Sequence, residues 1–163
     1  MKTITRSNIC LPIVAMILSA ALAVPAAAQN EVPFKGTFQG NDTVTPPATL
    51  ATTATGMGTL LGQFSLAQEV TINGANLTDT GSAQWIAANG DSVYTTVVGS
   101  AIPGSVIFEV TEIHTITGGT GRFTGAQGSF TVKRTHNVEP NADGTHFTSG
   151  SFDGTITSPG AVH

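Results

Sequence analysis

The sequence is poor in cysteine and in charge. Cys10 is the only cysteine among 163 residues, so no disulfide can form within one chain. Lysine and arginine together number six against ten aspartates and glutamates, and charged residues make up only 10 % of the chain. Nucleic acids and anionic membranes bind clustered basic residues, so this balance argues against either as a partner. The solvent-exposed surface must instead consist mainly of threonine, serine, asparagine, glutamine and glycine.

Helix-type periodicity is almost absent as well. Short runs of valine, isoleucine, threonine and phenylalanine recur between glycine-containing turns, which is typical of strands in a sandwich or barrel. We predict an all-β fold, an eight-stranded antiparallel β-barrel, because closure removes exposed sheet edges; an open sandwich is the alternative. The segment 45–56 follows neither period and is predicted to be a long mobile loop. The expected strands are 32–39, 57–65, 68–73, 83–88, 92–100, 106–117, 128–138 and 145–156.

Residues 1–28 have the pattern of a secretory signal peptide. Lys2 and Arg6 precede an almost wholly apolar run at 9–24, and three alanines ending at Ala28 supply the small residues of a cleavage site. A retained membrane anchor is the alternative, but no stop-transfer charge cluster follows the apolar run. We therefore expect cleavage after Ala28. This leaves 29–163 as a single secreted or periplasmic domain, without stable membrane insertion.

A glycine-rich stretch at 117–128 separates two of the predicted strands. Dinucleotide-binding glycines follow the spacing G-x-G-x-x-G and open a helix. Here the glycine after Gly121 is Gly125, one residue too late, and β-branched and aromatic residues follow. A Gly-Lys-Ser or Gly-Lys-Thr sequence for a phosphate-binding loop is also missing. The stretch therefore predicts a connection between strands and not a nucleotide site.

The same stretch carries a family resemblance. Gly-Gly-Thr-Gly-Arg-Phe at 118–123, continued by Gly-Ala-Gln-Gly at 125–128, resembles the signature of plant dirigent proteins, allene oxide cyclases and bacterial secreted proteins with the same barrel. Weaker matches at 58–64, 87–91 and 150–156 extend the resemblance over most of the chain after the signal segment. It implies an eight-stranded barrel, often a homo-oligomer such as a trimer or dimer, whose apolar interior holds a hydrophobic small molecule. It also implies cyclase, isomerase or stereoselective coupling activity without a cofactor.

Two neighbouring strands bring ionisable residues onto one face each. Period-two alternation puts Glu112 and His114 on one face of strand 106–117, and Arg134 and His136 on one face of strand 128–138. If these faces point inward, a carboxylate beside imidazoles suits acid–base steps, and the four residues are candidate catalytic groups. In the alternative, they lie at solvated strand ends and pair across the hairpin.

Four aromatic residues are candidate ligand contacts: Trp85, Tyr94, Phe108 and Phe130. Trp85 and Tyr94 combine an apolar body with a polar tip, which suits the wall of a cavity and also a packed core. The sequence contains no H-x-H, H-E-x-x-H or cysteine cluster, so we expect no metal. The family resemblance implies that no other cofactor is needed.

Three functions remain open from the sequence. The first is an exported barrel that holds a hydrophobic small molecule and acts as a cofactor-free cyclase, isomerase or coupling guide. The second is a non-catalytic barrel that binds such a ligand without proton chemistry. The third is a structural or surface-interaction protein, for which a neutral, threonine-rich and glycine-rich exterior is suited. The fold alone does not choose, because one barrel supports many functions.

Overall fold

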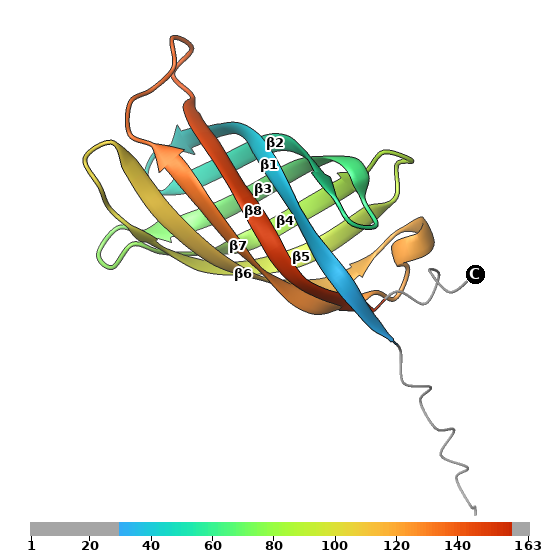
Figure 1. Cartoon of the computed structure of the whole chain (residues 1–163). Coiled ribbons are helices and arrows are strands. Elements are labelled where there is room, and N and C mark those ends of the chain that lie inside the picture. Colours follow the sequence, from blue (N-terminus) through green and yellow to red (C-terminus); the bar gives the residue numbers. More distant parts are fainter. Residues whose placement is uncertain (1–29, 158–163) are drawn as a thin grey trace, which may run out of the picture.

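The computed structural model describes residues 30–157 and shows a closed barrel of eight antiparallel strands (Figure 1). Each strand pairs with the next along the chain, and β8 pairs back with β1. This confirms the predicted all-β, eight-stranded antiparallel barrel. The predicted signal peptide, 1–28, lies outside the described residues. The strands are β1 (Glu31–Thr45), β2 (Thr49–Gly58), β3 (Gly62–Asn73), β4 (Thr78–Ala87), β5 (Ser92–Ile102), β6 (Ile107–Gly119), β7 (Gln127–Asn137) and β8 (His146–Thr157).

The second strand corrects two expectations. The predicted mobile loop 45–56 is wrong, because most of it forms β2, which pairs with β1 and β3. Its inward positions hold Leu50, Thr52 and Ala54, so small and polar residues hide the alternation of a strand. The predicted strand 57–65 is also wrong, because β2 ends at Gly58 and the chain turns before β3 begins.

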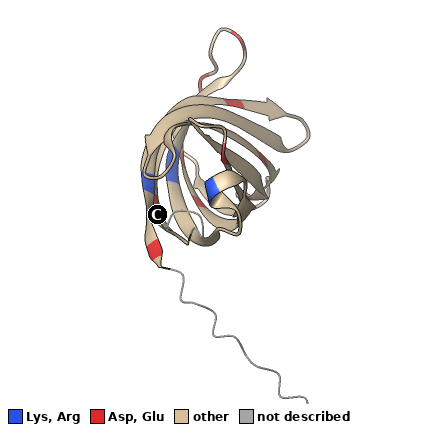
Figure 2. Ribbon diagram, turned by 90° about the vertical axis from the view of Figure 1, so that its right-hand side faces the viewer, with Lys and Arg blue, Asp and Glu red and all other residues tan. Residues whose placement is uncertain are grey.

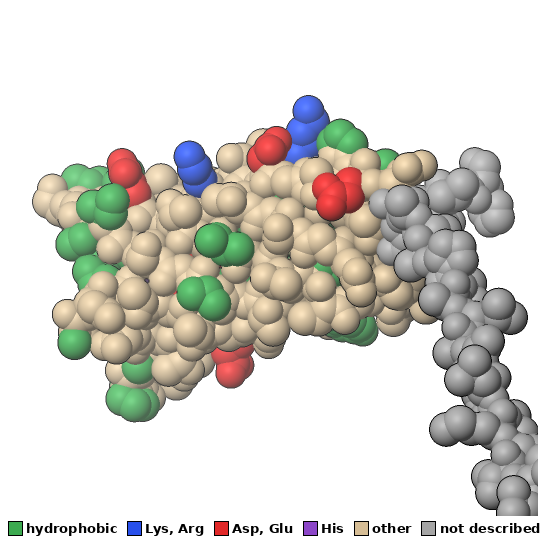
Figure 3. Space-filling model, turned by 90° about the horizontal axis from the view of Figure 1, so that it is seen from below, with side chains coloured by type: hydrophobic (Ala, Val, Ile, Leu, Met, Phe, Trp, Pro, Cys, Tyr) green, Lys and Arg blue, Asp and Glu red, His purple; other side chains and the backbone are tan. Residues whose placement is uncertain are grey.

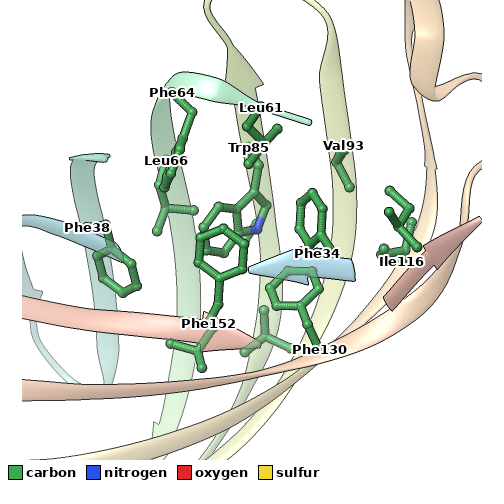
Figure 4. Packing of buried hydrophobic residues seen from close by; sticks show 14 of the residues in the cluster. Phe34, Phe38, Leu61, Phe64, Leu66, Trp85, Val93, Ile116, Phe130 and Phe152 are labelled. Carbon is green, nitrogen blue, oxygen red and sulfur yellow. The ribbon is translucent and has the colours of Figure 1, made fainter. Parts of the chain in front are cut away.

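Aromatic rings fill one half of the barrel (Figure 4). Trp85 is fully buried at its centre, and its ring centroid lies 4.9 Å from that of Phe152, 5.2 Å from Phe130 and 5.3 Å from Phe64. Burial of each such side chain stabilises the fold by about 1.5–3 kcal/mol, and tilted ring pairs add about 0.5–1.5 kcal/mol. An inward-facing glycine makes room for them: a Cβ on Gly36 would lie only 2.8 Å from the Phe152 ring. This half is a packed hydrophobic core.

The glycine-rich stretch 117–128 closes the aromatic end. It connects β6 to β7, as the sequence predicts, through the 3₁₀ turn η1 (Gly121–Phe123). Gly121 and Gly125 have φ of 54° and 73°, a region that favours glycine. Phe123 is 1 % exposed and belongs to the core cluster. The glycines therefore permit the turn that places the buried side chain of Phe123 over the strand ends.

Charges are sparse over the ribbon, as Figure 2 shows. The structure contains no helix within residues 30–157 that is long and apolar enough to span a membrane. Several of the few charged side chains are buried inside the barrel, among them Asp42, Asp79, Glu112 and Arg134.

Candidate functional site

A buried guanidinium joins two carboxylates inside the barrel, next to the aromatic core. Arg134 on β7 donates from Nε and Nη2 to the two carboxylate oxygens of Glu112 on β6, each at 3.1 Å. Its Nη1 donates to Asp42 Oδ2 on β1 at 2.9 Å and to Thr148 Oγ1 on β8 at 3.2 Å. This is the bidentate geometry in which arginine binds carboxylates most strongly. The network ties together strands that are far apart in the sequence.

Further polar side chains fix both carboxylates. Gln68 donates to Glu112 Oε1 at 2.7 Å, and Thr52 donates to Asp42 Oδ1 at 2.5 Å. Burial by itself would raise the pKa of Glu112, but the His114 imidazole and the Arg134 charge outweigh it and lower the pKa to about 2. Burial opposes ionisation of Asp42 too, yet its contacts with His136 and Arg134 lower the pKa. Both groups are therefore held as carboxylates.

The two histidines of the site have different surroundings. His114 is fully buried, stacks on Phe130 with ring centroids 4.9 Å apart, and its Nδ1 lies 3.0 Å from Thr95 Oγ1. His136 places Nδ1 2.6 Å from Asp42 Oδ2 and stacks on His146 at 4.8 Å. His114 thus belongs to the packed core, whereas His136 lies nearer the open end of the barrel.

A cavity of about 170 Å³ lies beyond this network, at the end opposite η1. Its walls are mostly aliphatic, with one aromatic side chain, and its polar groups come from three residues, Asp79, Arg134 and His136. Exposed aliphatic side chains also stand at this end, which is the left-hand end in Figure 3. They are Val44, Ile102, Val106 and Val138. The lining residues are Val44, Leu50, Ile72, Leu77, Asp79, Ala101, Phe108, Val110, Arg134 and His136.

Asp79 is the unpartnered group of this cavity. It is 6 % exposed, and its Oδ1 is buried without a hydrogen-bond partner. Gly99 on β5 pairs with Asp79 on one side and with Glu112 on the other. A Cβ at Gly99 would lie 2.8 Å from Asp79 Oδ1 and 2.6 Å from Glu112 Cγ, so the glycine gives both carboxyl side chains their room. Burial and the negative charge of Glu112 raise the pKa of Asp79 to about 6.

The structure brings the four candidate catalytic residues together inside the barrel. Glu112, His114 and Arg134 are 0–5 % exposed, so the inward-facing alternative holds and the solvated one is wrong for these strands. Only Arg134 and His136 reach the cavity, however. Glu112 and His114 lie deeper, next to the aromatic core, which places them behind the residues that a ligand would touch.

The four candidate ligand contacts are divided between three places. Phe108 lines the cavity. Trp85 and Phe130 lie in the aromatic half, where they pack against each other and leave the cavity to aliphatic residues. Tyr94 is 40 % exposed, because it alternates with the inward-facing Val93 and Thr95 and so points outward. Of the four residues, only Phe108 lines the cavity.

Two carboxylates of the site are missing from the sequence prediction. Asp42 lies three residues beyond the predicted end of the first strand, and Asp79 lies four residues before the predicted start of strand 83–88. In the structure both follow period two from buried aromatic residues, Asp42 from Phe38 and Asp79 from Trp85. Extension of that alternation past the apolar residues would have found them. Within residues 30–157, no cluster of three or more histidine, cysteine, aspartate or glutamate side chains has the arrangement of a metal site.

Comparison with solved structures identifies the architecture. The pterocarpan synthase dirigent protein GePTS1 superposes with a TM-score of 0.55 at 11 % sequence identity, over 88 % of this chain and 99 % of that one. The fold is a dirigent-like barrel. A second pterocarpan synthase dirigent protein, PsPTS1, has a TM-score of 0.49 at 11 % identity, over 80 % of this chain and 96 % of that one. Neither a family model nor a curated protein matches the sequence. At this identity, the likeness concerns the dirigent-like barrel itself.

Proposed function

We propose that this protein binds a small, mostly apolar molecule in the cavity at the open end of its barrel. The observation that carries the proposal is an apolar cavity whose few polar groups include an unpartnered carboxyl, that of Asp79. Binding pockets for small molecules have this composition, with apolar walls and a few polar groups that fix orientation. An engineered cavity of about 150 Å³ binds benzene, so the 170 Å³ cavity accommodates about one ring. A larger ligand would extend through the mouth.

The site also suits guidance of a reaction without a cofactor. Asp79 has a pKa of about 6, so its carboxyl exchanges a proton near neutral pH. Arg134 offers a positive charge that Glu112 and Asp42 hold in place. Rigid walls with a fixed charge and a proton-exchanging group can favour one conformation of an already reactive substrate. We therefore favour a cyclase, isomerase or stereoselective coupling guide, and a dirigent protein of the same fold is a pterocarpan synthase.

A non-catalytic ligand-binding barrel is the second candidate. The burial of Glu112 and His114 favours it, because two of the four ionisable residues first considered for catalysis have no access to the cavity. The two functions differ in the need for proton exchange. Replacement of Asp79 by asparagine would abolish turnover of the true substrate in the first case and would leave binding of the neutral 2-phenylethanol in the second.

A cavity-filling variant tests whether the cavity binds ligands at all. Ala101 lines the cavity from β5, so Ala101→Leu should weaken binding of 2-phenylethanol, followed by NMR chemical-shift changes, at least tenfold. Ala67→Leu is the matched control, since Ala67 is exposed on the outer face of β3. Native mass spectrometry of the purified protein would detect a retained natural ligand. Equal affinities for the two variants and the unaltered protein would refute binding in this cavity.

We further propose that the protein is exported and self-associates. The charged start, apolar run and alanine-rich end of residues 1–28 support export. The neutral outer surface, with the exposed residues Val98 and Ile113 paired across β5 and β6, supports contact between copies. The intact mass of protein recovered from the periplasm or medium would report cleavage after Ala28, and native mass spectrometry would report the oligomer.

A further inference from the structure

One buried carboxyl of the site has no cationic partner. Arg134 forms ion pairs with two carboxylates, Glu112 at 3.1 Å and Asp42 at 2.9 Å. His136 directs its Nδ1 to Asp42 at 2.6 Å, and His114 Nε2 lies 3.9 Å from Glu112 Oε2, so both rings are next to carboxylates other than Asp79. Asp79 is a third buried carboxyl, and it has no ion pair within 4.0 Å among the residues that the structure describes. Asp79 is therefore the buried carboxyl of the site that has no cationic partner, and it borders the cavity.

The groups around Asp79 leave its carboxyl without a cationic partner. Glu112 faces it across Gly99 and is negative, while Arg134 and His136 share the cavity with it from β7. Beyond them, Asp42 is bonded to His136, and His146 stacks on His136. An anion entering the cavity would meet the Asp79 carboxyl, with the negative charge of Glu112 behind it, while the Arg134 guanidinium is already paired with Glu112 and Asp42. A cation in the cavity would supply a partner for the Asp79 carboxylate.

We propose that the cavity selects a ligand whose polar end is a protonated amine on an apolar body about one ring in size, and that it rejects the corresponding carboxylate. This inference rests on the proposed function, since it names the class of ligand for the same cavity. An ammonium group offers three donors, which suits a carboxyl with an unpartnered oxygen. A hydroxyl group could donate the same hydrogen bond, but it would leave the negative charge of Asp79 without a cation. An ionised amine paired with a carboxylate is the stronger interaction of the two.

Proton binding and amine binding then compete for the same carboxyl. Asp79 has a pKa of about 6, so it is mostly ionised at pH 7.5 and mostly protonated at pH 5. Only the ionised form pairs with the amine, and apparent affinity falls in proportion to the fraction of competent protein. Amine binding should therefore be about tenfold weaker at pH 5 than at pH 7.5.

The test compares three ligands of matched size: 2-phenylethylamine, 2-phenylethanol and phenylacetate. Dissociation constants are measured by NMR titration at pH 7.5 and pH 5, for the unaltered protein and for Asp79→Asn. We expect the amine to bind about tenfold more tightly than the alcohol at pH 7.5, with the carboxylate weakest. In Asp79→Asn the amine should lose this advantage. Asp153→Asn is the matched control, because Asp153 is exposed on the outer face of β8.

The outcomes separate this inference from the proposed function. If the alcohol binds as tightly as the amine, or if the amine keeps its advantage in Asp79→Asn, the charge argument is wrong and the binding cavity stands. If none of the three compounds binds the unaltered protein, the proposed function fails and the inference fails with it. A second variant, Asp79→Ala, should behave as Asp79→Asn does, so that a folding defect in one variant does not decide the result.

Discussion

Replacement of Asp79 by asparagine should stabilise the protein at neutral pH. Asp79 is buried without a hydrogen-bond partner for Oδ1, and burial together with Glu112 raises its pKa from 3.8 to about 6. An acid whose pKa is raised in the folded state binds its proton more tightly there than in the unfolded chain. The contribution of Asp79 to the free energy of unfolding is therefore largest below pH 3.8, and this contribution is lost as the pH rises through 6. The shift of about two pH units corresponds to about 3 kcal/mol.

Urea denaturation at pH 4 and pH 7.5 measures the effect. An asparagine is neutral at both values, so Asp79→Asn should have nearly the stability of the unaltered protein at pH 4 and exceed it by about 3 kcal/mol at pH 7.5. Asp153→Asn, on the outer face of β8, controls for general effects of removing a negative charge. A difference that is the same at both pH values, or a variant that is less stable at pH 7.5, would refute the reasoning.

Other variants test the buried network and the cavity wall. Arg134→Met leaves Glu112 and Asp42 buried without their cation, so urea denaturation should show a loss of about 3–5 kcal/mol; a loss below about 1 kcal/mol would contradict this. Glu112 has its pKa lowered from 4.5 to about 2, so its carboxylate stabilises the fold above pH 4.5 and less as the pH falls toward 2. The stability lost in Glu112→Gln should shrink over that range, and a constant loss would count against it. Phe108→Ala widens the cavity, so the affinity for 2-naphthol, measured by NMR titration, should rise relative to that for 2-phenylethanol, and an unchanged ratio would place the ligand elsewhere.

Period-two alternation predicts most of the barrel, and it fails where the inward residues are small or polar. On β6 and β7, large apolar residues alternate with polar ones, and the predicted strands there agree with the observed ones within a few residues. On β2, the inward positions are taken by Leu50, Thr52 and Ala54, which look like a flexible segment in the sequence. The missing signal is non-local. Backbone pairing with β1 and β3 makes this segment a strand, whatever its own residues favour.

The candidate site shows the same division between local and non-local information. Alternation alone suffices to put Glu112 and Arg134 on the same faces as apolar neighbours. It does not show that Arg134 will bind Asp42, because 92 residues separate the two in the sequence and only barrel closure brings them together. Nor does alternation distinguish the filled half of the barrel from the open half. That difference comes from ring volume: Trp85 and four surrounding phenylalanines, Phe38, Phe64, Phe130 and Phe152, occupy one half, and smaller aliphatic side chains leave a cavity in the other.

Asp79 and Glu112 are buried carboxylates on either side of one glycine, and their surroundings differ in a way that bears on function. Glu112 is fully engaged by Arg134 and Gln68, so its burial is compensated within the protein. The Oδ1 atom of Asp79 has no such compensation, although asparagine would fit the same space beside Gly99 without the charge. A buried carboxyl without a partner fits a role in binding better than a role in structure. The uncompensated charge of Asp79, next to an apolar cavity, is therefore the strongest reason to look for the ligand there.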